Sequence, residues 1–170
     1  TATVLIQSPY PEAELYLSVV RHKVLYQSMT TVKGGAPQVQ FPITAEMLPN
    51  AAVEAVLVRR GEPLSKVEPG NLKDLVRMGF APFDLNLNEK TLSVAIAPTQ
   101  PTVMPQAEQT VNLTLKDRQG QPVKGQFTVM VVNESVLQLT GYRAPNLVET
   151  VYAKQDISTR FGDNRGDVVL

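Results

Sequence analysis

The sequence predicts an all-β fold built from antiparallel β-sandwiches, and three observations support this expectation. Short runs rich in Val, Leu, Ile, Thr and Tyr are separated by many of the chain's 13 prolines and 10 glycines, a spacing typical of sandwich strands and turns. Apolar and polar residues alternate in several of these runs, as they do in residues 80–87. Helical periodicity is scarce throughout the chain. With 170 residues, the chain has room for two domains of modest size.

Seven strand candidates precede residue 98, the number typical of an immunoglobulin-like or fibronectin-type sandwich. The second and third candidates flank a polar break at His22 and Lys23, so we expect them to form a hairpin. Prolines beside the fourth candidate favour a sheet edge. We expect a surface loop over residues 61–70, and residues 72–77 predict either one helical turn or the start of the next strand. The seven candidates are residues 3–7, 14–21, 24–32, 38–43, 52–60, 80–87 and 91–97.

The first domain is therefore expected to occupy residues 1–97, and residues 98–170 to form a second, partial domain. Residues 98–102 predict a stiff polar connector, because their two prolines favour an extended path. Residues 109–116 and 125–132 flank a turn, which predicts a β-hairpin. The remainder offers too few strands to complete a sandwich. Part of its apolar inner face then lacks a covering sheet, so the tail would fold over it or two chains would dimerise there.

Two features of the last 42 residues qualify this expectation. Residues 129–142 leave an apolar strand and are expected to turn over Asn133, Glu134 and Ser135. Residues 147–152 predict a short helix. The rest of the tail is rich in Pro, Asn, Asp, Arg and Gly, which favours loops.

Composition excludes several classes of function. Sixteen basic residues balance sixteen acidic ones, which argues against nucleic acid and against anionic membranes as partners. The absence of cysteine rules out disulfides and cysteine-based metal sites. Apolar runs reach about six residues, far short of the roughly 20 that a transmembrane helix requires, so no transmembrane segment is predicted and we expect a soluble chain. Both ends have the composition expected of cuts through a longer polypeptide.

No catalytic, cofactor-binding or metal-binding residue is predicted. His22 is the only histidine and its neighbours are basic, so we expect a solvated turn residue. Asp156, Asp163 and Asp167 lack the spacing and the following Glu of a calcium-binding loop. Gly34 and Gly35 indicate a turn, since no Gly-Lys-Ser/Thr follows to hold a phosphate.

Three short motifs are interpreted as chance matches. Arg165-Gly166-Asp167 spells a cell-adhesion tripeptide, but its surroundings favour a flexible turn. Asn112 and Asn133 each begin a glycosylation pattern, and the first of these lies inside a predicted strand.

Nine blocks of the chain follow one another in the order of a known family: residues 4–10, 17–21, 24–25, 47–50, 57–59, 78–80, 92–94, 116–123 and 129–142. Together these blocks resemble the macroglobulin-like domains of bacterial alpha-2-macroglobulins. The resemblance covers nearly the whole sequence, and the blocks are specific jointly rather than singly. It departs from the family pattern in three places: residues 104–108 lack the usual Pro-Gly-Glu turn, Asn133 replaces an acidic residue, and residues 21–23 replace Arg-Glu-Gly.

The resemblance implies tandem macroglobulin-like sandwiches in a bacterial protease inhibitor, located in the periplasm, at the cell surface or secreted, with a lipid anchor as one option for the full-length parent. In that family a protease cuts a bait region and is then entrapped, so the partners would be proteases and neighbouring domains of the same chain. The fragment itself would be a scaffold without catalytic activity or cofactor. Residues 146–167 would begin the approach to the bait region. Residues 106–109 imitate the family's Cys-x-Glu-Gln thioester, but Gln106 has no thiol.

Two alternatives remain beside the inhibitor scaffold. A carbohydrate- or protein-binding module at the cell surface could use the same sandwich, but it would need clustered exposed aromatic residues. The chain has no Trp, and Tyr10, Tyr26, Tyr142 and Tyr152 are scattered along it. A hydrolase is disfavoured, because there is no second histidine and no pairing of a nucleophile with a base. The parent sequence beyond Leu170 would distinguish an inhibitor from a binding module.

Overall fold

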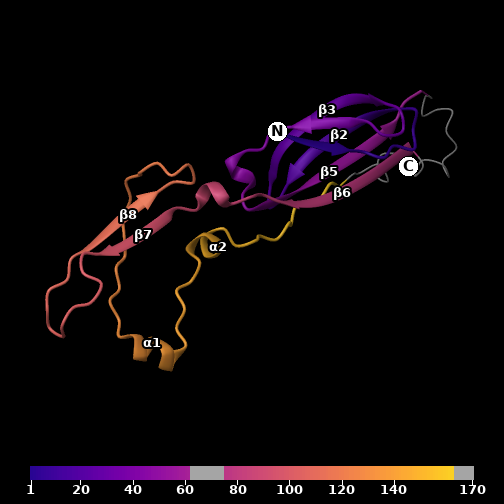
Figure 1. Ribbon diagram of the computed structural model, residues 1–170. Coiled ribbons are helices and arrows are strands. Elements are labelled where there is room, and N and C mark those ends of the chain that lie inside the picture. The colour runs from indigo at the N-terminus through magenta and orange to yellow at the C-terminus, as the bar shows by residue number, and fades with distance from the viewer. Residues whose placement is uncertain (62–74, 163–170) are drawn as a thin grey trace. The chain divides into compact units, whose positions relative to one another are not determined.

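The computed structural model describes residues 1–61 and 75–162. The chain divides into two compact units (Figure 1): unit 1 contains residues 1–85 together with the segment that begins at Lys154, and unit 2 contains Asn86–Ala153. The fold is all-β, since antiparallel sheets supply most of its regular structure. Among the described residues, no helix has the length and apolar character needed to cross a bilayer.

Unit 1 is a sandwich of two antiparallel sheets. Strands β1 (Ala2–Leu5) and β4 (Gln38–Phe41) form the smaller sheet. The larger sheet has the strand order β3-β2-β5-β6, and its β2–β3 pair confirms the predicted hairpin. A 3-10 helix over Ala45–Met47 leads into β5. The four strands of the larger sheet are β2 (Glu12–Val20), β3 (Val24–Lys33), β5 (Asn50–Arg59) and β6 (Val76–Asp84).

The core of unit 1 lies between these two sheets. Every second residue of β2 faces it, and Leu15, Leu17 and Val19 have no exposed surface, as the two-residue period of a strand requires. Phe41 and Met47 close the core from the smaller sheet and the 3-10 helix. Each fully buried aliphatic side chain contributes about 1.5–3 kcal/mol of burial free energy. The larger sheet's other side, here called the outer face, carries the alternate residues of β2, β5 and β6.

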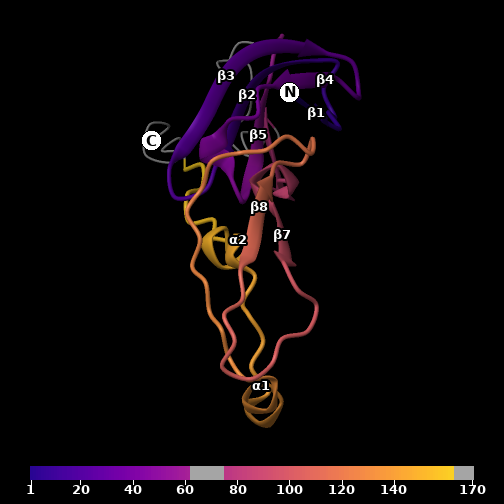
Figure 2. The same cartoon turned by 60° about the vertical axis from the view of Figure 1, so that its left-hand side comes forward.

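Unit 2 contains one two-stranded sheet and three short helical segments. β7 (Ser93–Pro98) and β8 (Val111–Lys116) pair in antiparallel register (Figure 2). A 3-10 helix covers Asn88–Lys90, and the α-helices are α1 (Glu134–Thr140) and α2 (Leu147–Val151). The second of these agrees with the helix predicted over residues 147–152. Among its described residues, Leu115 is the only buried apolar one. Unit 2 is therefore a two-stranded ribbon with little core of its own, and the second, partial domain over residues 98–170 stays a prediction.

Strand pairing in unit 2 corrects four expectations. Residues 91–97 were expected to close the first sandwich, but β7 pairs with β8 because Val94 and Ile96 face Leu115 and Leu113 across the ribbon. The compact units accordingly divide after residue 85, where we expected a boundary after 97. Residues 98–102 join this pair rather than link two domains. The predicted return strand over 125–132 does not form, since beyond β8 the described pairing is a single bridge from Lys116 to Pro122.

The expected turn over residues 133–135 is instead the start of α1. The side chain of Asn133 accepts a hydrogen bond from the N–H of Ser135, which is the N-cap arrangement. Gly141 ends the helix with φ of 63°, a left-handed conformation that glycine adopts without strain. Residues 62–70 of the expected surface loop, and 72–74 of the segment before β6, lie outside the described residues.

Candidate functional site

A returning segment of the chain crosses the outer face of the larger sheet and forms hydrogen bonds with it. This returning segment, residues 154–162, begins where Lys154 Nζ lies 2.6 Å from Asp84 Oδ2. The first part of unit 1 ends at the next residue after Asp84, Leu85, whose N–H donates to the carbonyl of Pro49 at 2.8 Å. Residues 157, 159 and 161 are half-buried while their neighbours are exposed. This alternation is typical of an extended segment with one side on a surface.

Fixed polar groups of the sheet bind the main chain of the returning segment. The side-chain amide of Asn50 forms two hydrogen bonds with Gln155: Nδ2 donates to the carbonyl and Oδ1 accepts from the N–H, each at 2.9 Å. The N–H groups of Ser158 and Thr159 both donate to the carbonyl of Arg21, at 2.8 and 2.9 Å. Because every residue except proline carries these main-chain groups, such contacts recognise an extended backbone rather than a side-chain sequence.

Glu54 is a buried carboxylate at the centre of this face. Its side chain is part of a residue only 4% exposed on β5. The N–H of Phe161 donates to Oε1 at 2.9 Å, and Ser18 Oγ donates to Oε2 at 3.5 Å. Burying a carboxylate raises the free energy of the folded state unless the carboxylate is hydrogen-bonded. The returning segment supplies the shorter of the two hydrogen bonds that Glu54 accepts. Without that segment, Glu54 would face solvent with Ser18 as its neighbour on β2.

Two ring contacts add side-chain selectivity to this surface. The ring of Phe161 lies 6.3 Å from that of Tyr16, with an interplanar angle of 48°. The guanidinium carbon of Arg160 lies 3.9 Å from the centre of the Phe80 ring, within the distance of a cation–π contact. Tyr16 and Phe80 project from β2 and β6 respectively. The two contacts therefore span strands on either side of β5.

Arg21, at the end of β2, organises the turn beside this surface. The residue is 7% exposed, and its guanidinium donates to the carbonyls of Glu46, Leu48 and Asn50. The planar fork of an arginine suits several acceptors at once. The guanidinium thus fixes residues 46–50, while the Arg21 carbonyl binds the returning segment. His22 is exposed, and its Nδ1 lies 3.4 Å from Arg21 Nε.

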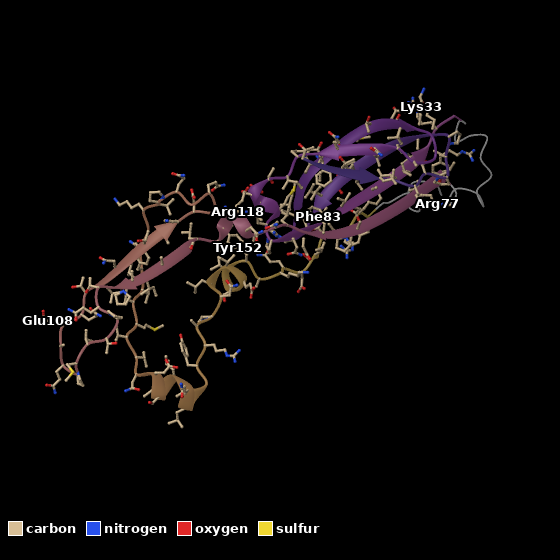
Figure 3. All side chains as sticks on the ribbon, viewed as in Figure 1. Lys33, Arg77, Phe83, Glu108, Arg118 and Tyr152 are labelled. Carbon is tan, nitrogen blue, oxygen red and sulfur yellow. The ribbon has the colours of Figure 1, made fainter. Side chains whose placement is uncertain are left out.

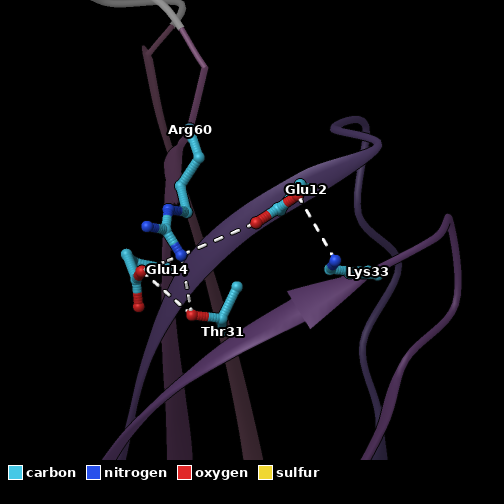
Figure 4. Close-up of polar contacts among 5 residues, drawn as sticks. All are labelled: Glu12, Glu14, Thr31, Lys33 and Arg60. Carbon is cyan, nitrogen blue, oxygen red and sulfur yellow. Dashed lines mark hydrogen bonds and ion pairs between the residues drawn. The ribbon is translucent and has the colours of Figure 1, made fainter.

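A network of surface charges joins the start of β2, the end of β3 and the residue that follows β5, at the end of the sheet away from Arg21 (Figure 4). Arg60 NH1 lies 2.9 Å from Glu14 Oε1 and 3.6 Å from Glu12 Oε1, and it donates to Thr31 Oγ1 at 3.0 Å. Lys33 Nζ lies 3.8 Å from Glu12 Oε2. These side chains are well exposed, so each pair contributes roughly 0–1 kcal/mol. The two carboxylates face cations, which is a structural arrangement rather than an acid–base pair.

An apolar groove opens between the edges of β1 and β6. Its volume is about 350 Å³, and Leu5, Ile6 and Met78 are among the residues that line it. Arg77, labelled in Figure 3, lies on its β6 side. Each bordering strand has one partner among the described residues, β4 for β1 and β5 for β6. Among the described residues that line the groove, no nucleophile is paired with a base.

Much of unit 2 is irregular backbone with exposed side chains. Residues 99–110, 117–132 and 141–146 contain no helix or strand. Glu108 and Arg118, labelled in Figure 3, lie in the first two of these segments and are exposed. Val131 is 95% exposed. Extended, weakly packed backbone is what a protease can take into its cleft.

The residues weighed from the sequence do not gather into one site. Gly34 follows β3 with φ of 83°, in the turn expected there. Asp156 is exposed within the returning segment, Asn112 is exposed on β8, and Asn133 caps α1. Asp163 and the motif at residues 165–167 lie outside the described residues. Among the described residues, no group of three or more His, Cys, Asp or Glu side chains is placed to hold a metal ion.

Two further expectations meet different outcomes. Residues 106–109 lie at a turn, since the N–H of Ala107 donates to the carbonyl of Met104 at 3.1 Å, and Gln106 has φ of 68°. The approach to the bait region over residues 146–167 stays a prediction, and within that range the outer face binds residues 155, 158, 159 and 161 through their main chain. The binding residues Arg21, Asn50 and Glu54 were not predicted. A single charged residue inside the apolar run of β5 was the available signal for Glu54.

Comparison with known proteins identifies the family. The family model described as the alpha-2-macroglobulin bait region domain matches residues 1–139. A protein of Nostoc sp. (strain PCC 7120 / SAG 25.82 / UTEX 2576) named alpha-2-macroglobulin homolog is 62% identical over 170 residues, which are 100% of this chain and 9% of that protein. The chain thus spans less than a tenth of that relative's length. No solved structure matches. The chain therefore belongs to the alpha-2-macroglobulin family, and its residues 1–139 correspond to the family's bait region domain.

Proposed function

We propose that this chain is a scaffold segment of a bacterial protease inhibitor that entraps proteases after they cut its bait region. The observation that carries the proposal is the match of residues 1–139 to the bait region domain. The contrast between the two units is consistent with it. Unit 1 is closed around a core and holds its returning segment by hydrogen bonds, whereas unit 2 offers long stretches of exposed, irregular backbone.

In this proposal the chain performs no chemistry of its own. Unit 1 acts as a support, and a cut in exposed backbone elsewhere changes how the inhibitor's domains are arranged. The partners are proteases and neighbouring domains of the same polypeptide. The location is the periplasm, the cell surface or the medium, with a lipid anchor as one option for the full-length protein.

Proteolysis of the full-length protein tests the entrapment directly. The inhibitor is mixed with a broad-specificity protease, and residual activity is measured on a large protein substrate and on a small peptide substrate. Entrapment predicts strong loss of activity on the protein substrate with most peptide activity retained, because a cage excludes large molecules while the protease's own site stays open. Equal loss on both substrates would indicate direct blockage of the protease site, and no loss on either would refute the inhibitor function.

A matched control separates bait cleavage from simple binding. The inhibitor is cut beforehand by the same protease, which is then inactivated and removed. If cleavage triggers the rearrangement, the cut inhibitor should no longer trap fresh protease. Undiminished trapping after the cut would contradict a cleavage-driven mechanism.

A further inference from the structure

We propose that the outer face of unit 1 is a binding surface for an extended peptide, and that it retains the chain's own returning segment after the polypeptide is cut between residues 141 and 146. The occupant is residues 154–162, bound in cis in the intact chain and in trans after a cut. The biological use of this retention rests on the proposed function, in which a protease cuts the chain. The binding surface itself does not depend on that function.

The sheet supplies the polar side of this surface on rigid elements. Asn50 and Glu54 both lie on β5, one of the two inner strands of the sheet, and Arg21 directly follows β2, the other inner strand. Together they make five hydrogen bonds to the main chain of residues 155, 158, 159 and 161, each between 2.8 and 2.9 Å. Since strands of one sheet keep a fixed spacing, these acceptors and donors hold their positions whether or not the peptide is covalently continuous with unit 2.

The burial of Glu54 is the second argument. Its carboxylate is in a residue 4% exposed, and one of its two hydrogen bonds comes from Phe161. Loss of the returning segment would withdraw that donor from a charged group, which is unfavourable for unit 1 itself. Binding and the stability of unit 1 are therefore linked, so the surface favours recapture of the peptide over a vacant state.

The path of the chain means that this surface can join two pieces of a cut polypeptide. The chain leaves unit 1 after Leu85 and returns at Lys154, where the Lys154–Asp84 ion pair forms. A cut anywhere in residues 86–153 breaks the covalent link between the two parts of unit 1. After such a cut, among the described residues, the contacts between the returning segment and the outer face hold the two pieces together.

An engineered cut in the otherwise intact chain tests the proposal. A recognition sequence for a site-specific protease is inserted between Tyr142 and Pro145, in an exposed and irregular stretch. The C-terminal piece carries a fluorophore, and its release is followed by anisotropy on dilution and by gel filtration. The proposal predicts that the pieces co-elute after complete cleavage. Separation of the two pieces at micromolar concentration would overturn it.

Variants of the returning segment identify the surface responsible, and they leave the core of unit 1 unchanged. The double variant Arg160→Ala, Phe161→Ala removes both ring contacts and should raise the dissociation constant of the cut piece roughly tenfold or more. Thr159→Pro removes an N–H that donates to Arg21, so it should weaken retention independently. The matched control is Val151→Ala, whose side chain is 73% exposed in α2. Its cut piece should have the same dissociation constant as the cut piece of the parent chain. Retention equal in all variants would show that other contacts hold the pieces and would refute the assignment.

Because the cut is engineered, the outcome is independent of whether natural proteases attack this chain. Failure of retention would leave the inhibitor proposal standing. Failure of entrapment by the full-length protein would leave the peptide-binding surface standing.

Discussion

Removal of the Arg21 guanidinium should destabilise unit 1 more than removal of any surface charge. In Arg21→Met the aliphatic stem is largely kept, but three carbonyls lose their donor. The hydrogen bond to the Glu46 carbonyl is 3.0 Å long, and the one to the Leu48 carbonyl is shorter still. The bond to the Asn50 carbonyl is longer, at 3.3 Å. A hydrogen bond to a charged group is worth about 1.5–3 kcal/mol. Since water can reach part of the turn once the side chain is gone, we expect a net loss of about 3 kcal/mol.

Urea denaturation followed by far-ultraviolet circular dichroism measures this loss. Small proteins have m-values of about 1–3 kcal/mol per molar urea, so the midpoint should fall by roughly 1–3 M. Arg21→Lys retains the charge without the planar fork, and we expect about half the effect. The matched control is Lys33→Met, which removes an exposed ion pair 3.8 Å long and should cost less than about 1 kcal/mol. The reasoning is refuted if Arg21→Met and Lys33→Met have the same midpoint.

Three further predictions concern the core, a helix cap and the exposed run of unit 2. Leu17→Ala creates a cavity at a residue with no exposed surface and should lower the free energy of unfolding by about 2–5 kcal/mol; a change below 1 kcal/mol in a thermal melt would contradict the proposed core. Asn133→Ala removes the N-cap of α1 and should cost that helix about 1 kcal/mol, seen as Cα chemical-shift changes confined to residues 133–141, whereas changes in β2 or β5 would contradict a local role. Val131→Ser replaces a side chain that is 95% exposed and should shift unfolding by less than about 0.5 kcal/mol; a larger loss would mean that this residue is buried between chains, which sedimentation would reveal.

Alternation of apolar residues predicted most strands of unit 1, but β6 covers Val76–Asp84 where a strand over residues 80–87 was expected. β2 and β3 flank the polar break at His22, and the hairpin follows from that short connection. The alternation of apolar and polar residues does not determine which strands pair with each other. For this reason β7 was expected in the first sandwich, whereas it pairs with β8. Its apolar residues Val94 and Ile96 suit either the first sandwich or a ribbon with β8. The observed pairing depends on Leu115 and Leu113, which lie 21 and 17 positions further along the chain.

The binding surface on the outer face could not be predicted in the same way. Its main-chain hydrogen bonds join residues more than 100 positions apart, such as Asn50 with Gln155 and Glu54 with Phe161. Most of the surface's contacts use the main chain of the returning segment, which leaves no mark in the sequence. A partial signal existed in Glu54 and Arg21, because charged residues in or beside apolar strands require partners. The sequence indicates that such partners exist, and only the structure identifies them.

Limited proteolysis of the chain tests the central contrast between a closed unit 1 and an open unit 2 most directly. The chain is treated with a low concentration of a broad-specificity protease, and the earliest cuts are mapped by mass spectrometry. We predict first cuts within residues 99–110, 117–132 or 141–146, with the strands of residues 2–59 and the returning segment protected. First cuts inside β2 or β5, or within residues 154–161, would contradict the account.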